Sequence, residues 1–84
     1  MRVERLDEPV SCRAEFARGG VTPVSFTRHG REHRVTQVHA RWVDRSGRHP
    51  QHYFSAQCDA GEIYELRLDA GEMQWHVQSV LLEG

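Results

Sequence analysis

The chain has 84 residues, of which 38% are hydrophobic and 27% are charged, and its formal net charge at pH 7 is −1. This length suits one small domain with a thin hydrophobic core, and an isoelectric point near 6.6 lacks the strongly basic character typical of nucleic-acid-binding domains. No stretch approaches the roughly 20 apolar residues of a membrane helix, and the N-terminus lacks the apolar run of a signal peptide. We therefore expect a cytoplasmic protein that does not contact a membrane.

The first eight residues are mostly charged, so we expect a flexible N-terminus over 1–8, frayed or loosely helical, followed by a single β domain over 9–84. Apolar and polar residues alternate from Val10 to Ala17, which is the pattern of a half-buried strand. Gly19-Gly20 ends this predicted strand.

A second strand is predicted around Val24 and Phe26, both with inward side chains, and Pro23 is tolerated there at an edge or at the first position. His29-Gly30 is typical of a two-residue hairpin loop, which pairs Arg28 with Arg31 and sets Val24 opposite Val35.

The inward phase then changes, because Val38, Ala40 and Trp42 alternate out of step with Val35. One extra residue near Thr36 or Gln37 would restore the alignment, which predicts a β-bulge. A polar loop over residues 44–50 separates this strand from the next one, over 51–58.

The tetrapeptide Asp-Ala-Gly-Glu occurs twice, at 59–62 and at 69–72, and Asp and Gly are what tight turns demand. If the first copy closes a hairpin with loop 59–61, Phe54 faces Leu66 and Ala56 faces Tyr64, so apolar residues meet apolar residues.

The second copy fits a loop with one residue more. A four-residue loop over 69–72 sets Trp75 opposite Leu66 and Val77 opposite Tyr64. The last strand is then predicted from Met73 to about Leu82.

These elements predict an all-β fold, a single small antiparallel meander of five to six strands bent into a partly open SH3-like barrel. The expected core consists of twelve residues: Val24, Phe26, Val38, Ala40, Trp42, Phe54, Ala56, Tyr64, Leu66, Leu68, Trp75 and Val77.

Charge is distributed unevenly along the chain. Residues 28–52 hold six arginines against two acidic residues, a net charge of +4, whereas residues 53–84 hold one arginine against six acidic residues, a net charge of −5. Guanidinium groups on phosphates beside aromatic platforms are how small β modules hold single strands. The predicted nucleic-acid-binding residues are Arg28, Arg31, Arg34, Arg45 and Arg48, with Trp42, Tyr53 and Phe54 nearby in the sequence.

Five histidines lie in the same segment, among them His29 and His33, then His49 and His52, followed by Cys58. They lack a CxxC or HExxH context, and a spacing of four suits a helix better than a strand, so we expect solvated histidines and no metal site. Cys12 and Cys58 lie in the inward phase of their strands, which favours buried reduced thiols over a disulfide or a nucleophile. We find no motif for a catalytic residue or a cofactor, and we expect no enzyme activity.

The chain resembles a bacterial domain of unknown function that occurs alone and at the C-terminus of Y-family DNA polymerase-like proteins. The resemblance covers about two thirds of the chain and departs from the family at His33, where an aromatic residue is expected, and in the polar loop after Trp42. It implies an accessory role near DNA synthesis or damage tolerance. The residues that carry it are Pro23-Val24-Ser25-Phe26, Gly30-Arg31-Glu32, Val35, Trp42, Tyr53-Phe54, Gly61, Tyr64-Glu65-Leu66, Asp69 and Trp75.

Two functions are therefore expected. The first is a non-catalytic accessory module that contacts the backbone of DNA or RNA through the five arginines, beside a DNA-polymerase-associated protein. The alternative is a protein-interaction or self-association module, including a homo-oligomer, that uses an edge strand and the opposed charges of its two halves.

Overall fold

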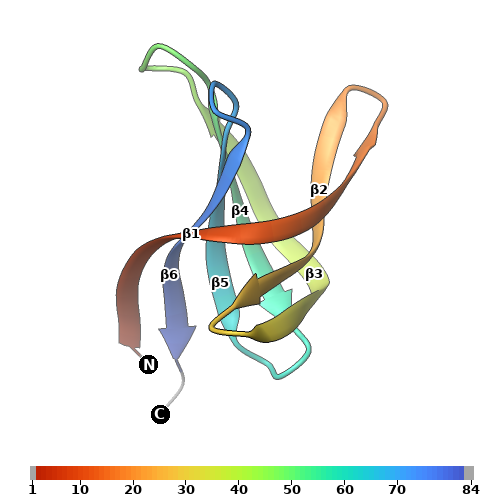
Figure 1. The fold of residues 1–84 in the computed structure, drawn as a ribbon, viewed down its shortest axis with the longest axis vertical. Coiled ribbons are helices and arrows are strands. Elements are labelled where there is room, and N and C mark those ends of the chain that lie inside the picture. Colours follow the sequence, from red (N-terminus) through yellow and green to blue (C-terminus); the bar gives the residue numbers. More distant parts are fainter. Residues whose placement is uncertain (1, 83–84) are drawn as a thin grey trace.

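The computed structural model describes residues 2–82 and contains six antiparallel strands that follow one another around a closed barrel (Figure 1). This confirms the predicted all-β fold, with six strands. The described residues include no helix long and apolar enough to cross a membrane. The strands are β1 (Arg2–Ala17), β2 (Gly20–Arg28), β3 (Arg31–Asp44), β4 (Gln51–Cys58), β5 (Ile63–Asp69) and β6 (Gln74–Leu82).

Strand β1 closes the barrel because it pairs with two neighbours in succession. Its first part, from Arg2 to Val10, pairs with β6, and its second part, from Ser11 to Ala17, pairs with β2. The expectation of a frayed or loosely helical segment over 1–8 is wrong for residues 2–8, since the strand begins at Arg2 rather than at Val10. Residue 1 lies outside the described residues.

The β2–β3 hairpin has the predicted two-residue loop, with Arg28 opposite Arg31. His29 and Gly30 both have positive φ, at 54° and 75°, as do Arg18 and Gly19 in the β1–β2 turn, and this is the geometry of the hairpin turn that matches strand twist. The pairing of β2 with β3 extends from the turn to Ser25 and Arg34. Pro23, which has no N–H to donate, lies just beyond this point.

Strand β3 contains two irregularities in its pairing with β4. The first falls at Thr36, between Val35 and Gln37, and confirms the predicted bulge. The second falls at His39 and was not predicted. Because each extra residue shifts the alternation of side chains by one, the second bulge turns Ala40 and Trp42 outward, and both are exposed.

The two copies of Asp-Ala-Gly-Glu form different turns, as predicted. At the first copy Phe54 lies opposite Leu66 and Ala56 opposite Tyr64, and the Cys58 N–H donates to the Glu62 carbonyl at 2.9 Å, which closes loop 59–61.

At the second copy Asp69 pairs with Gln74, so the loop has four residues, but it spans 70–73 rather than 69–72. Trp75 therefore faces Leu68, and Val77 faces Leu66, each two residues along β5 from the predicted partner, so these two pairings were predicted wrongly.

The repeated glycines serve different purposes. Gly61 has φ +96°, a conformation that residues with a Cβ rarely adopt, and nothing lies near its missing side chain. Gly71 instead packs against the ring of His49, and a Cβ there would overlap that ring. Together with a hydrogen bond from the Ala70 N–H to the Pro50 carbonyl at 3.1 Å, this close approach joins the β5–β6 turn to the β3–β4 loop.

Eight of the twelve expected core residues are buried: Phe26, Phe54, Ala56, Tyr64, Leu66, Leu68, Trp75 and Val77. Val38 is half-buried and packs against this core, and Val24 is half-buried outside it, whereas Ala40 and Trp42 are exposed, so these last two predictions are wrong. The core also contains residues that were not among the twelve, namely Val10, Val21, Cys58 and Val80. Val80 reaches the core because β6 has an irregularity at Gln78 that sets Val80 opposite Tyr64.

Candidate functional site

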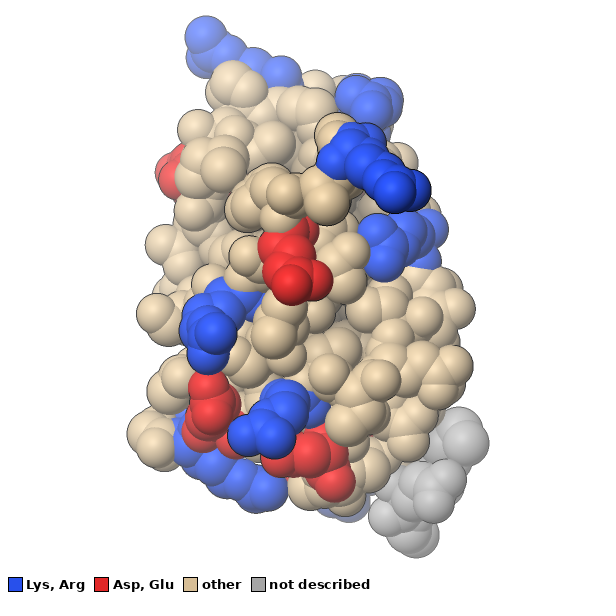
Figure 2. Space-filling model, turned by 90° about the vertical axis from the view of Figure 1, so that its right-hand side faces the viewer, with Lys and Arg blue, Asp and Glu red and all other residues tan. Residues whose placement is uncertain are grey.

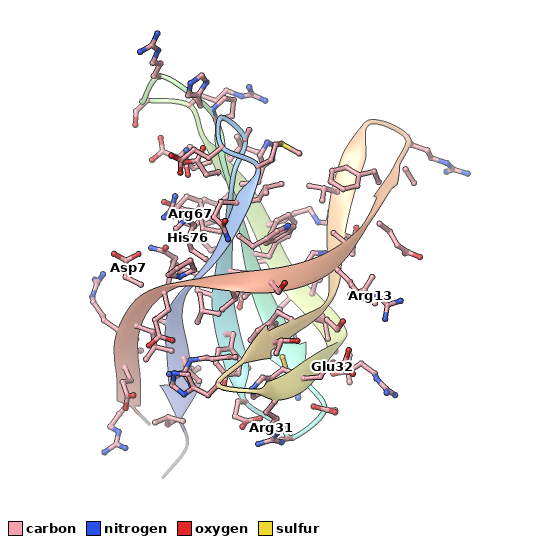
Figure 3. The ribbon with its side chains drawn as sticks, viewed as in Figure 1. Asp7, Arg13, Arg31, Glu32, Arg67 and His76 are labelled. Atoms are coloured by element: carbon pink, nitrogen blue, oxygen red, sulfur yellow. The ribbon has the colours of Figure 1, made fainter. Side chains whose placement is uncertain are left out.

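The five arginines predicted to bind nucleic acid do not form one surface. Arg28, Arg31 and Arg34 lie at or near the β2–β3 turn, whereas Arg45 and Arg48 lie in the β3–β4 loop, at the opposite end of the 14-residue strand β3. Figure 3 shows Arg31 at the lower end of the barrel, and Figure 1 shows the β3–β4 loop at the upper end. In Figure 2 basic side chains are spread over both ends, and acidic ones lie beside them at the lower end.

Arg28 is engaged within the protein. Its Nε donates to Glu8 Oε1 at 2.8 Å, which ties the β2–β3 hairpin to β1. The hydrogen bond from Arg28 lowers the pKa of Glu8, so the carboxylate stays charged and keeps its partner. Arg28 is thus less available to an external phosphate than its place in the sequence indicates.

A groove of about 660 Å³ opens where β2 and β3 part, and we call it the seam groove. Beyond Ser25 and Arg34, residues 20–24 of β2 and 35–44 of β3 have no register partners in each other within the described chain. The β1–β2 hairpin leans away there from the β3–β4 and β5–β6 turns (Figure 1). The groove is lined by residues 16–21, 41–43, 45, 52–54, 68, 70 and 73.

Arg41 bridges the seam. Its Nη1 donates to the Val21 carbonyl of β2 at 3.1 Å, and its Nη2 lies 3.5 Å from Thr22 Oγ1. Arg41 reaches inward because it lies opposite Phe54, and its Cζ lies 5.6 Å from the centre of that ring. One guanidinium therefore occupies a backbone acceptor that a neighbouring strand would otherwise use.

The walls of the groove carry exposed apolar side chains. Phe16 lies opposite Val21 near the end of the β1–β2 hairpin and is 65% exposed, since the hairpin leans away from the barrel. Val43 on β3 and Met73 in the β5–β6 turn face the same space and are 41% and 63% exposed. Contiguous exposed apolar surface of this kind marks binding sites in small soluble domains.

A second exposed feature lies on the outer face of β3 and β4. Trp42 and Tyr53 are opposite each other and stack with ring centres 5.4 Å apart and planes 1° from parallel. Tyr53 lies opposite Arg67, whose Nη1 donates to Gln51 Oε1 at 2.6 Å and whose Nε donates to Gln78 Oε1 at 2.9 Å. Figure 3 places Arg67 near His76 and Asp7, on the side away from the β1–β2 hairpin.

His33 is part of the core rather than a surface residue. It is 4% exposed, stacks on Phe26 with ring centres 5.0 Å apart, and meets Tyr64 edge-on at 5.2 Å. Burial lowers the pKa of His33, with a further contribution from the positive charge of Arg31. In the described residues no group of three or more histidines, cysteines and acids is close enough together to hold a metal ion.

Cys12 and Cys58 are free thiols, the first half-buried and the second buried, as their inward phase predicted. Burial raises the pKa of each thiol to about 12. Both therefore remain protonated at neutral pH, where a thiol is a poor nucleophile.

Sequence reasoning did not single out Phe16 or Arg41 as site residues. Phe16 belongs to the predicted half-buried strand, but it is 65% exposed because the β1–β2 hairpin leans away from the barrel, and that lean depends on contacts far along the chain. Arg41 was not predicted as a site residue because the single predicted bulge placed it on the outer face of the barrel, whereas the second bulge turns it into the seam.

Comparison with models of protein families, with curated proteins and with solved structures finds no match to this chain. The resemblance to the polymerase-associated domain stays a prediction.

Proposed function

We propose that this protein is a protein-interaction module that takes up an extended peptide as an added strand in the seam groove. The observation that carries the proposal is the pair of strand segments, 20–24 of β2 and 35–44 of β3, that do not pair with each other and of which residues 20–21 and 41–43 line an apolar groove. An extended peptide gains affinity there from main-chain hydrogen bonds and specificity from alternate side chains that enter apolar pockets.

The surroundings of the groove support this kind of ligand. Phe16, Val43 and Met73 offer apolar contacts to alternate residues of a strand, and the Val21 carbonyl offers a backbone acceptor once Arg41 moves. Predicted phosphate ligands, by contrast, are divided between the two ends of the barrel, which weighs against a single nucleic-acid surface.

The proposal is tested by selecting binders from a displayed library of random peptides of about 12 residues on the immobilised full chain. Binding of a selected peptide is then measured for Val43→Gln, which replaces an apolar side chain of the groove by a neutral polar one, and for the matched control Val3→Gln, at a site on β1 that is 63% exposed.

We expect Val43→Gln to weaken binding by about tenfold and Val3→Gln to leave it within about twofold. In hydrogen exchange, amides on the groove side of residues 20–22 and 41–43 gain protection when the peptide is bound. A library that yields no binder above an unrelated protein, or a peptide insensitive to Val43→Gln, would refute the proposal.

A second candidate function is single-strand nucleic-acid binding on the outer face. The exposed Trp42–Tyr53 stack, followed in the chain by Arg45 and Arg48, supports it, because bases stack on aromatic rings and guanidinium groups bind phosphates. Fluorescence anisotropy with labelled single-stranded and double-stranded oligonucleotides tests it. Binding that weakens with salt and on Trp42→Ala supports this function, and no binding at low salt rules it out.

A further inference from the structure

We propose that the strand taken up by the seam groove is acidic, and that a carboxylate on it is bound by Arg41 as that side chain leaves the Val21 carbonyl. This inference rests on the proposed function and names the chemistry of the partner.

The groove carries positive charge without a compensating acid in its lining. Its lining contains Arg18, Arg41 and Arg45, and no acidic residue among the described ones that line it. Opposite charges across an interface steer encounter and fix the register of a bound segment, whereas a basic peptide would meet three like charges.

Arg41 has no acidic partner among the described residues. No carboxylate of the described residues lies within 4.0 Å of its guanidinium, which instead uses two of its five donors on uncharged oxygens of Val21 and Thr22. The contact with the Phe54 ring holds the group at the seam on one side. Its remaining donors are free to form the paired, charge-assisted hydrogen bonds that a carboxylate accepts.

Arg41 and an entering strand compete for the Val21 carbonyl. An N–H of a strand that pairs with β2 there approaches the oxygen that Arg41 now contacts, which favours release of the guanidinium. Water can solvate the released guanidinium, because Arg41 is an exposed residue. A carboxylate on the entering strand offers it charge-assisted hydrogen bonds that a neutral strand does not, and this difference favours acidic peptides.

Arg41 thus has two roles. Its guanidinium hydrogen-bonds to the Val21 carbonyl at the edge of β2 while the groove is empty, and it binds the carboxylate when a strand enters. The expected ligand is an extended segment in which apolar residues alternate with polar ones and in which at least one Asp or Glu falls near Val21.

The test uses the peptides selected from the random library and needs no change in the protein for its first arm. Each Asp or Glu of a selected peptide is replaced singly by Asn or Gln. We expect one such replacement to weaken binding to the wild-type chain by about tenfold.

The second arm uses Arg41→Gln and the matched control Arg31→Gln, at the far end of β3. With Arg41→Gln the same peptide replacement should change binding by less than about twofold, and with Arg31→Gln it should keep its full effect. Thermal melts of both variants show whether they are folded. If Arg41→Gln does not fold, the peptide replacements on the wild-type chain, with their dependence on salt, decide the matter.

The outcomes separate the two proposals. Selected peptides that bind in the groove without enrichment of Asp and Glu, or whose acidic residues can be replaced without loss, overturn the acidic ligand and leave the peptide-binding function standing. No selected peptide at all overturns both. An oligonucleotide of about 12 thymidines that displaces the peptide and loses affinity with Arg41→Gln would assign the groove to nucleic acid and overturn the inference as well.

Discussion

The buried ring of His33 lowers the stability of the barrel, and we predict that His33→Phe raises the free energy of unfolding. The ring is 4% exposed and lies among aromatic neighbours, stacked on Phe26 at an interplanar angle of 14° and edge-on to Tyr64. Its Nδ1 atom is buried and has no hydrogen-bond partner among the described residues. A phenyl ring keeps the aromatic contacts and removes the unpaired polar atom.

The magnitude follows from these contacts. A buried polar atom without a partner costs about 1–3 kcal/mol, and the aromatic packing is preserved, so we expect a gain of about 1–2 kcal/mol at neutral pH. For a domain of this length, 1 kcal/mol corresponds to an increase of about 4–8 °C in the melting temperature.

The effect of His33 also depends on pH, with a defined sign. Burial lowers the pKa of His33 in the folded state, so the unfolded chain, in which the ring titrates near its ordinary value of about 6.5, binds the proton more readily. Stability is therefore greatest above about pH 6.5 and falls as the pH drops below that value towards the lowered pKa of the folded state. His33→Phe has no such loss, and its advantage over the wild-type chain widens in acid.

Urea unfolding at pH 7.5 and at pH 5.5, followed by tryptophan fluorescence, measures both effects, because Trp75 is buried in the core. The control is His39→Phe, since His39 is exposed and has a single side-chain contact, 2.8 Å from Gln57 Oε1. The control should change stability by about 0.5 kcal/mol or less at either pH. The reasoning is refuted if His33→Phe unfolds at lower urea than the wild-type chain, or if its advantage is the same at both pH values.

Three further predictions follow from the packing. Gly71→Ala should lower the free energy of unfolding by about 1–3 kcal/mol, because the added Cβ overlaps the His49 ring. In the double variant His49→Ala should recover much of this loss, as measured by urea unfolding. A Gly71→Ala variant as stable as the wild type would contradict the contact. Leu66→Ala should cost about 2–5 kcal/mol, because the side chain is fully buried, and a smaller loss in the same assay would mean a loosely packed core. Cys58, whose pKa burial raises to about 12, should react with a thiol reagent in urea but hardly at all in the folded chain at pH 7.5, and rapid labelling of the native protein would show that the strand opens.

The parts of the fold that follow from neighbouring residues were predictable. His29-Gly30 and Asp59-Ala60-Gly61 define tight turns through positive φ and short polar side chains, and each turn then fixes the register of the two strands beside it. The change of phase after Val35 likewise revealed the bulge at Thr36. Each of these features depends on a segment of about ten residues, within which apolar and polar positions can be matched directly.

Features that depend on distant partners were not predictable. Residues 2–8 form a strand because β6, near the other end of the chain, offers them a partner, and their charges gave no sign of it. The bulge at His39 breaks an alternation that looked regular, and it moves Trp42 outward and Arg41 into the seam. The arginine cluster failed as a single surface because closeness in the sequence places residues at both ends of a long strand.

The seam must accept a strand from a partner and must also resist pairing with other chains, and these two requirements usually conflict. An unpaired strand edge invites pairing with other chains, and proteins protect such edges with proline, bulges and inward charges. Here Pro23 removes a donor beside the edge, two bulges distort the facing strand, and Arg41 covers the Val21 carbonyl. Pro23 and the bulges are permanent, whereas a side chain can rotate away. The protection against unspecific pairing therefore depends on the Arg41 side chain, which a ligand can move. Replacing Arg41 should abolish the selectivity for acidic peptides and make the chain more prone to self-association. Light scattering of Arg41→Gln, compared with Arg31→Gln, would measure the self-association.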